Sequence, residues 1–257
     1  MTGFRILVPK SGKPDLGPLM KALKAGRDAF EEDHMNIRKV DVRLYALVDP
    51  ERAGGYDLAE LSWLCAAGGA TLVQLRDKQG DTRQMIEEAR AMRLNLAPMH
   101  VPLLINDRVD VALAAGADGV HVGQDDMPAE DARRLMGPDA IIGLSIKTVA
   151  QAEAAPVELL DYVGIGGVYV TTSKNNPDPP IGLDGLARIA AVFRRRRPGL
   201  PLCAIAGIDL ANAGTTIAAG VDGVAVISAL SLSPNPPDVA REMRAAIDKV
   251  IAARSAP

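Results

Sequence analysis

The sequence predicts an α/β fold in which eight parallel strands alternate with helices and close into a (β/α)8 TIM barrel with an N-terminal extension. The chain has 257 residues, a length that suits one such barrel. From Val42 onward, apolar runs of strand length alternate with helix-length segments. Aromatic residues make up only 3% of the chain, so the core must be built from Val, Ile, Leu and Ala, as aliphatic barrel interiors are.

Residues 1–40 differ in composition from the rest and are expected to form an extension, either helical or without regular structure. Prolines and glycines interrupt the stretch from Pro9 to Pro18. The segment Leu19–Glu32 carries a partial apolar stripe that is compatible with one amphipathic helix. No chemical motif lies in this region, and the barrel is assigned to residues 41–257.

Eight apolar runs are predicted to be the strands. They are Leu44–Val48, Thr71–Leu75, Val101–Ile105, Gly119–Val122, Ile141–Leu144, Tyr162–Ile165, Leu202–Ile205 and Gly223–Val226. Between them, Leu58–Ala67, Thr82–Leu96 and Leu183–Arg197 show the 3.6-residue spacing of helices. Near-continuous apolar strands alternating with helices indicate a parallel sheet that is covered on both faces.

An internal repeat supports the barrel. The sequence Ala115–Val120 (AGADGV) recurs as Ala219–Val224 (AGVDGV). Each copy reads as the end of a helix, a glycine suited to the left-handed position, and the start of a strand. A doubly wound open sheet is the alternative, but residues 49–55 after the first strand do not fit its glycine-rich phosphate loop.

Composition excludes several classes of protein. The net charge is −3, so no global positive field attracts nucleic acid. No run of about 18 uncharged apolar residues indicates a membrane span, and Met1–Lys13 lacks the apolar stretch of a signal peptide. Cys65 and Cys203 are the only cysteines, so no disulfide framework is expected. These features predict a cytoplasmic protein that binds neither membranes nor nucleic acid.

The basic run Arg194–Arg197 is interpreted as a solvated helix end. It comes just before Pro198 and Gly199 at the end of a predicted helix, where cations complement the helix dipole. No aromatic residues alternate with it, as they would in a platform for nucleic acid.

The residues at the ends of seven consecutive predicted strands are mostly polar, and they lie at the end where barrel enzymes carry their chemistry. In chain order these residues are Gln74, Arg76 and Lys78; Asn106, Asp107 and Arg108; Gln124, Asp125 and Asp126; Ser145 and Lys147; Thr171, Thr172, Ser173 and Lys174; Ala206 and Gly207; and Ile227 and Ser228. Because the carboxyl ends of all barrel strands face the same rim, these groups are predicted to converge. His121 alternates with apolar neighbours and is interpreted as a histidine of the barrel interior.

The acidic residues of this rim favour magnesium. Asp107 and the pair Asp125 and Asp126 offer hard oxygen ligands without cysteine or a histidine cluster. Mg²⁺ usually binds through one or two carboxylates together with substrate phosphates. Three nearby cations, Arg76, Lys78 and Lys174, could balance the charge of a diphosphate. The alternative for Asp107 is the N-cap of a helix.

Gly207 and Ser228 follow the seventh and eighth strands, where barrels bind monophosphates. Small residues there leave main-chain N–H groups accessible, although a tight turn would also explain Gly207. No catalytic triad, nucleophile elbow or zinc-protease motif is present. A reaction that loses diphosphate needs none of these, because it depends on neutralising the leaving group and holding the acceptor.

Several of these motifs resemble the thiamine-phosphate synthase family. They are Gln74–Lys78 (QLRDK), Ile105–Ala114 (INDRVDVALA), Gly116–Gln124 followed by Asp126, Gly143–Ser145, Thr171–Lys174 (TTSK), Gly207–Ile208 and Val226–Ala229. They occur in the family's order and cover roughly residues 42–250. The first three motifs together are highly specific for the family. The Gly-Ile and Ile-Ser dipeptides are weak indications when each is taken alone.

The resemblance implies that a hydroxymethylpyrimidine diphosphate is coupled with a carboxylated thiazole phosphate, giving thiamine phosphate, diphosphate and CO₂ with Mg²⁺ required. By the same resemblance, the pyrimidine diphosphate is bound by Gln74, Leu75, Arg76, Asp77, Lys78, Asn106, Ser145 and Lys174, and the metal by Asp107 and Asp126. Thr171, Thr172, Ser173, Gly207, Ile227 and Ser228 would bind the thiazole phosphate. Lys174, Ser145 and Arg76 are expected to be catalytic.

The sequence departs from the family's pattern at a few positions. Ala206 stands where the first glycine of Gly-Gly-Ile is common, and its methyl group could crowd a phosphate. Gly167 and Val170 replace common prolines, and Lys147 stands where histidine is frequent.

Two other functions remain as alternatives, a thiazole tautomerase and a non-catalytic phosphate-ligand sensor. The predicted binding site for metal and diphosphate argues against the tautomerase, because that reaction has no diphosphate substrate. A sensor would need an output segment, which only residues 1–40 could provide. A homo-oligomer is left open.

Overall fold

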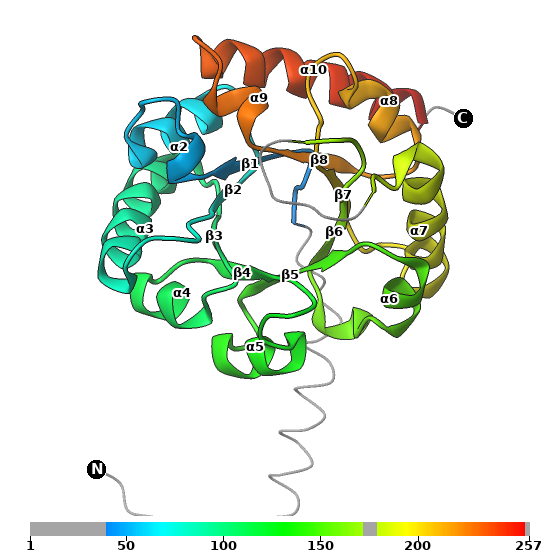
Figure 1. Cartoon of the computed structure of the whole chain (residues 1–257), viewed down its shortest axis with the longest axis horizontal. Helices are drawn as coiled ribbons and strands as arrows, with labels where there is room; N and C mark the ends of the chain where they lie inside the picture. The colour runs from blue at the N-terminus through cyan, green and yellow to red at the C-terminus, as the bar shows by residue number, and fades with distance from the viewer. Residues whose placement is uncertain (1–39, 172–178, 255–257) are drawn as a thin grey trace, which may run out of the picture. The chain divides into compact units, whose positions relative to one another are not determined.

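Eight parallel strands close into a barrel in the computed structural model, which describes residues 40–171 and 179–254 (Figure 1). The strands are β1 (Leu44–Val48), β2 (Leu72–Leu75), β3 (Leu103–Asn106), β4 (Gly119–Val122), β5 (Ile141–Ile146), β6 (Tyr162–Gly166), β7 (Leu202–Ile205) and β8 (Gly223–Val226). Each strand pairs with the next in the chain, and β8 pairs with β1. The predicted TIM barrel is therefore confirmed, and every predicted strand is present.

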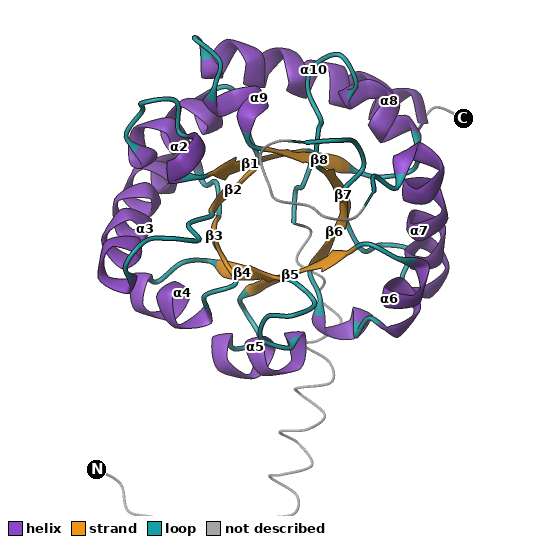
Figure 2. Ribbon diagram, in the orientation of Figure 1, coloured by secondary structure: helices purple, strands orange, loops and turns teal. Residues whose placement is uncertain are grey.

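Helices surround the barrel on the outside (Figure 2). They are α2 (Leu58–Ala67), α3 (Thr82–Leu96), α4 (Val109–Ala115), α5 (Ala129–Met136), α6 (Val149–Ala154), α7 (Gly182–Arg196), α8 (Ala213–Ala218), α9 (Ser228–Ser231) and α10 (Pro236–Arg254), with short 3₁₀ turns at Pro50–Arg52 (η1), Ala97–Met99 (η2) and Val157–Leu159 (η3). Within the described ranges, no helix is long and apolar enough to cross a membrane. The predicted extension, apart from Val40, lies outside the described residues.

The period-2 alternation of the strands produces two apolar layers. On β1, Leu44, Ala46 and Val48 pack in the layer between the barrel and the helices, whereas Tyr45 and Leu47 pack inside the barrel. The outer layer is mostly aliphatic, as the composition predicted, but it includes one fully buried aromatic residue, Phe193. The interior differs, because it buries two of the chain's four tyrosines, Tyr45 and Tyr162.

Glycine makes room for one of these interior tyrosines. A Cβ at Gly143 on β5 would lie 2.2 Å from Cζ of Tyr162 and 2.4 Å from its hydroxyl oxygen. Such distances are well inside van der Waals contact, so no larger residue could occupy this position without displacing the ring. Glycine at position 143 is therefore what allows the ring of Tyr162 to lie inside the barrel.

The repeated sequence forms matching turns on the lower face of the barrel. Gly116 adopts the left-handed conformation with φ of 69°, and its N–H bonds to the carbonyl oxygens of the helix end. The aspartates of the two copies make equivalent hydrogen bonds. Asp118 accepts one from N–H of Leu103 at 2.8 Å, and Asp222 accepts one from N–H of Leu202 at 2.9 Å. Each carboxylate therefore satisfies an N–H at the start of the preceding strand, which confirms the structural interpretation of the repeat.

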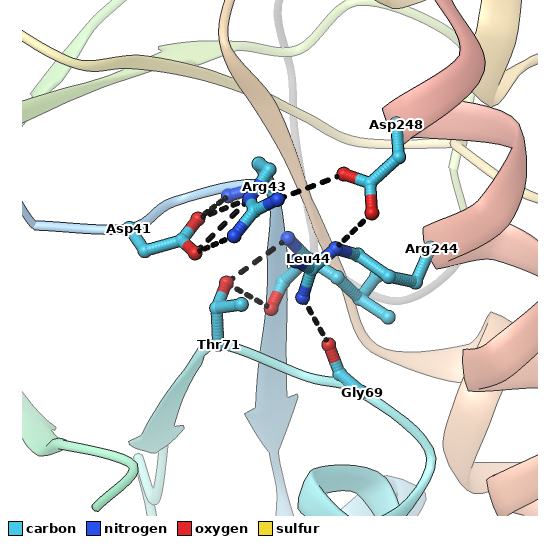
Figure 3. A network of polar contacts seen from close by, with 7 residues as sticks. All are labelled: Asp41, Arg43, Leu44, Gly69, Thr71, Arg244 and Asp248. Atoms are coloured by element: carbon cyan, nitrogen blue, oxygen red, sulfur yellow. Dashed lines mark hydrogen bonds and ion pairs between the residues drawn. The ribbon is translucent and has the colours of Figure 1, made fainter. Parts of the chain in front are cut away.

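Figure 3 shows a polar network that joins the start of β1 to α10. Nε of Arg43 donates to Asp41 at 2.9 Å, and its Nη1 lies 3.1 Å from a carboxylate oxygen of Asp248 on α10. The same carboxylate pairs with Arg244, which also donates to the carbonyl oxygen of Gly69 at 3.0 Å. The network ties the first strand to the last helix, where the barrel closes.

The arginine run at the end of α7 contacts neighbouring elements. Arg194 pairs with Asp222 at 2.7 Å and Arg195 with Glu153 at 2.5 Å. Arg196 donates to the carbonyl oxygens of Ala152 and Ala155, and Arg197 donates to those of Val157 and Leu160. The helix end was predicted correctly, and Arg195 is solvated as expected. Arg194, Arg196 and Arg197 are instead partly buried, and the last two satisfy carbonyl oxygens of helix ends and turns that need donors.

Candidate active site

A cavity of about 640 Å³ opens at the carboxyl ends of the strands. Its walls include most of the residues predicted to bind the pyrimidine diphosphate and the metal: Gln74, Arg76, Lys78, Asn106, Asp107, Asp126 and Ser145. A second cavity of about 500 Å³ is lined by Thr171, Gly207, Ile227 and Ser228, which were predicted at the thiazole phosphate. Thr171, Ile205, Ala206 and Ala225 line both cavities, so the two adjoin.

Two residues of the QLRDK motif do not line the cavity with their side chains. Leu75 is fully buried in the layer between strands and helices, because its neighbours Gln74 and Arg76 take the inward positions. Asp77 accepts hydrogen bonds from the N–H groups of Gln79 and Gly80 at 2.9 and 2.8 Å. It therefore shapes the loop after β2, and any contact of these two residues with a substrate falls to their main-chain groups.

The predicted residues Thr172, Ser173 and Lys174 lie outside the described residues. Thr171 comes immediately before them and lines both cavities. On the other side of the gap, the chain returns to α7, whose first residue Gly182 donates its N–H to the carbonyl oxygen of Val168 at 3.1 Å. The described residues on the two sides of the gap are therefore close to each other, at Val168 and Gly182.

Arg76 is held by a partner that the sequence did not reveal. Its guanidinium forms an ion pair with Asp49, which follows the end of β1 and is 2% exposed. Asp49 also accepts a hydrogen bond from N–H of Glu51 at 3.0 Å, so its carboxylate is fixed by the turn η1. Its position directly after a strand was the only signal that could have indicated a site residue.

Asp107 occupies an unusual backbone position between β3 and α4. Its φ is 61°, in the left-handed region, and its N–H donates to the carbonyl oxygen of His121 at 2.8 Å. Its carboxylate pairs with Lys78 and accepts a hydrogen bond from Nδ2 of Asn106 at 2.6 Å. The N-cap position of helix α4 is occupied by Arg108, without a capping hydrogen bond from its side chain, and not by Asp107, so the helix-cap alternative is wrong.

The second predicted metal ligand, Asp126, lies beside Asp107. Burial raises the pKa of Asp107, the pairing with Lys78 lowers it, and the neighbouring carboxylate of Asp126 raises it further, with a net increase. Asp126 itself is oriented by the N–H of Gly123, which donates to it at 2.8 Å. Two carboxylates from successive strand ends thus repel each other in a half-buried site, and a cation would relieve that repulsion.

The donor set fits a hard cation that completes its coordination with substrate oxygens. Among residues 40–171 and 179–254, no group of three or more His, Cys, Asp or Glu side chains could hold a metal ion by itself. Asp107 and Asp126 offer only oxygen donors, which Mg²⁺ prefers, and Mg²⁺ commonly uses just one or two carboxylates. The arrangement therefore agrees with a metal that binds together with a phosphorylated substrate.

A chain of hydrogen bonds between residues of five strands runs along the floor of the larger cavity, and every member except Tyr162 lines the cavity. Gln74 Nε2 donates to the hydroxyl of Tyr45, which lies 2.9 Å from the hydroxyl of Tyr162. The Tyr162 oxygen lies 2.7 Å from Nδ1 of His121, and Nε2 of His121 lies 2.8 Å from Oγ of Ser145. His121 is confirmed as an interior histidine, but its contact with Ser145 and the roles of both tyrosines were missed.

The smaller cavity is bordered by a strained turn after β7. Gly207 has φ of 67°, and a Cβ there would lie 2.5 Å from the carbonyl oxygen of Val170. Ala206 has φ of 88°, a conformation that is costly for an L-residue. The preference for glycine at position 206 is therefore explained by the backbone. At Gly207, the tight turn is confirmed, and the role in phosphate binding stays a prediction.

Comparison with known proteins identifies the family. The family model described as thiamine monophosphate synthase matches residues 44–230. A thiamine-phosphate synthase of Agrobacterium fabrum (strain C58) is 52% identical over 218 residues, which cover 85% of this chain and 99% of that protein. A thiamine-phosphate synthase of Laribacter hongkongensis is 45% identical over 209 residues, covering 81% and 96%.

A solved structure agrees with this result. The thiamine phosphate pyrophosphorylase from Pyrococcus furiosus superimposes with a TM-score of 0.72 at 34% identity, covering 83% of this chain and 98% of that one. The family match spans the eight strands and all residues that line the larger cavity. On this evidence the chain belongs to the thiamine monophosphate synthase family.

Proposed function

We propose that this protein is a thiamine-phosphate synthase that couples 4-amino-2-methyl-5-hydroxymethylpyrimidine diphosphate with carboxythiazole phosphate. The products are thiamine phosphate, diphosphate and CO₂, and the reaction takes place in the cytoplasm. The observation that carries the proposal is the pair of adjoining cavities at one rim, one with cations and carboxylates and the other beside a glycine turn. Two phosphorylated substrates could be bound side by side in such a site.

The larger cavity is suited to the pyrimidine diphosphate. Arg76 and Lys78 supply positive charge for the diphosphate, and Asn106 supplies an amide donor. Asp107 and Asp126 would hold Mg²⁺, which would screen the charge of the diphosphate leaving group. Lys78 is paired with Asp107 in the structure, which supports a shared role of the two residues at the diphosphate and its metal.

Lys174, Ser145 and Arg76 are assigned the catalytic roles. Arg76, and Lys174 from the TTSK segment, would stabilise the charge on the departing diphosphate, which is the main requirement of this step. Ser145 lies on the cavity floor, where its hydroxyl would bind the pyrimidine ring. Ionisation at the pyrimidine methylene group is favoured by the ring's amino donor, so no protein nucleophile is needed.

The smaller cavity is suited to the thiazole phosphate. Gly207, Ile227 and Ser228 border it, and the loops after strands seven and eight of barrels commonly bind phosphate through main-chain N–H groups. Thr171, Thr172 and Ser173 would contact the thiazole between the two cavities. Holding the ring nitrogen next to the methylene carbon supplies much of the rate enhancement through orientation.

The test is incubation of the full chain with both substrates and Mg²⁺, with thiamine phosphate and diphosphate measured as products. We expect both products in equal amounts, and a strong loss of turnover in Lys174→Ala and in Asp107→Ala with the fold retained. Isomerisation of the thiazole without coupling would instead indicate a tautomerase. Near-wild-type rates in both variants would refute the assignment of the site.

A further inference from the structure

The hydrogen-bonded chain on the cavity floor has a direction, and Gln74 sets it. Nε2 of Gln74 donates to the hydroxyl oxygen of Tyr45, so this oxygen is an acceptor for that bond. A phenol has a single proton to donate, and the other hydrogen-bond partner of the Tyr45 hydroxyl among the described residues is the hydroxyl of Tyr162, 2.9 Å away. We infer that Tyr45 gives its proton to Tyr162, because this buried proton has no other acceptor there. Burial raises the pKa of both phenols, so each keeps its proton.

The direction continues through the histidine. The Tyr162 oxygen accepts from Tyr45, so its own proton points to Nδ1 of His121 at 2.7 Å. An imidazole that accepts at Nδ1 is the neutral tautomer with its proton on Nε2. Nε2 of His121 then donates to Oγ of Ser145 at 2.8 Å, and the hydroxyl proton of Ser145 is left to point to another acceptor.

The two ends of the chain thus present opposite hydrogen-bonding groups to the cavity. At the Ser145 end the group is a donor. At the other end, the Oε1 atom of Gln74 is buried and has no hydrogen-bond partner among the residues that the structure describes. A buried acceptor without a partner is costly, so a ligand donor at this position would be favourable.

We propose that Tyr162 is a positioning residue that orders these hydrogen bonds, so that Ser145 presents a proton and Gln74 a carbonyl oxygen to the substrate ring. This inference rests on the proposed function, because an aminopyrimidine offers the matching pair of an amino donor and a ring-nitrogen acceptor. Tyr162 is fully buried and is not part of the cavity wall formed by the described residues. It therefore acts through Tyr45 and His121 and not by contact.

The tautomer of His121 is the first test and needs no substrate. In ¹⁵N-labelled full-length protein, we expect Nδ1 of His121 to show the chemical shift of an unprotonated ring nitrogen and Nε2 that of a protonated one. The signals are assigned by their loss in His121→Gln. A protonated Nδ1 in the neutral ring would mean that the chain runs in the opposite sense, with the amide of Gln74 turned over, and would overturn the proposal.

The second test separates positioning from folding. Tyr162→Phe removes the hydroxyl at the centre of the chain. We expect the KM for the pyrimidine diphosphate to rise about tenfold, the effect of one lost hydrogen bond, with the KM for the thiazole phosphate unchanged. Tyr169→Phe is the matched control, because its hydroxyl bonds to Thr216 of α8 at 3.1 Å; both KM values should stay at the wild-type level.

An unchanged KM for the pyrimidine diphosphate in folded Tyr162→Phe would refute the positioning role, and so would an equal rise in both KM values. If Tyr162→Phe does not fold, the nitrogen shifts of the wild type still decide the proposal. If the wild type forms no thiamine phosphate, the proposed function fails, whereas the tautomer remains measurable.

Discussion

Asp49 and Arg76 form an ion pair between the ends of two neighbouring strands, β1 and β2, at the rim of the barrel. Both side chains are largely buried, with 3% and 13% of their surfaces exposed. The carboxylate is fixed by a second hydrogen bond from the N–H of Glu51. Asp49 therefore determines where the guanidinium of Arg76 lies before any substrate arrives.

Replacing Asp49 with asparagine should impair both stability and substrate binding. Removal of one partner from a buried pair leaves the other charge uncompensated, which costs about 3 kcal/mol of unfolding free energy. We also expect a higher KM for the pyrimidine diphosphate, because Arg76 loses its fixed position. Denaturant unfolding and steady-state kinetics measure the two effects.

The control for this variant is Asp57→Ala. Asp57 caps α2 by accepting a hydrogen bond from the N–H of Glu60 at 3.0 Å, and its loss should cost about 1 kcal/mol. Because Asp57 does not line the active-site cavity, KM should not change. A wild-type KM in Asp49→Asn would show that Arg76 needs no anchor.

Asp126→Asn should weaken the binding of magnesium. The amide retains the hydrogen bond from the N–H of Gly123 but removes one of the two negative charges that would hold the metal. We expect the Mg²⁺ concentration for half-maximal activity to rise about tenfold or more. The measurement is a Mg²⁺ titration at saturating substrates. The same charge change in Asp131→Asn, at an exposed pair with Arg134, should leave the titration unchanged.

The barrel could be predicted closely because its strands are apolar runs that need no knowledge of their partners. The predicted start of β3 was wrong by two residues, because the strand was expected from Val101 and begins at Leu103. Pro102 has no N–H for the strand ladder, although its carbonyl oxygen accepts a hydrogen bond from Val73 at 3.1 Å. A proline inside an apolar run was therefore the available signal for the later start.

Residues of the candidate site could be predicted from the sequence only where they directly follow the end of a strand. Arg76 and Asp107 are rim residues because they follow strand ends, and topology brings such ends together. The partners Asp49 and Arg76 are 27 residues apart, and Tyr45 and Tyr162 are 117 apart. No local pattern encodes such pairs, since they arise when the barrel closes. The tyrosines were also missed because buried aromatic residues in strands usually serve only packing.

Two adjacent substitutions should have opposite effects at the turn after β7. In Gly207→Ala, the new Cβ would meet the carbonyl oxygen of Val170 at 2.5 Å, with φ of 67°, and we expect a loss of about 2 kcal/mol in stability. In Ala206→Gly, relief of the strain at φ of 88° should give equal or greater stability, by up to about 1 kcal/mol. Thermal unfolding of the two variants checks the sign of each.

The same pair of variants also tests the thiazole phosphate site. Gly207 lines the smaller cavity, and a displaced turn would move its main-chain N–H groups away from the phosphate. Gly207→Ala should therefore raise the KM for the thiazole phosphate, whereas Ala206→Gly should not. If the KM for the pyrimidine diphosphate rose by the same factor in Gly207→Ala, the turn would not be specific to the thiazole phosphate.

Two arginines at the end of α7 should contribute differently to stability, because one donates to main-chain carbonyl oxygens and the other forms an exposed ion pair. Arg197→Gln removes donors from the carbonyl oxygens of Val157 and Leu160, which would leave two main-chain acceptors without a protein partner and cost about 2 kcal/mol. Arg195→Gln breaks only the exposed pair with Glu153, where 63% and 48% of the side chains are accessible, and should cost less than about 1 kcal/mol. Denaturant unfolding in low and high salt separates them, because only the exposed pair is screened. Equal losses in both variants would mean that charge, and not carbonyl capping, explains the run.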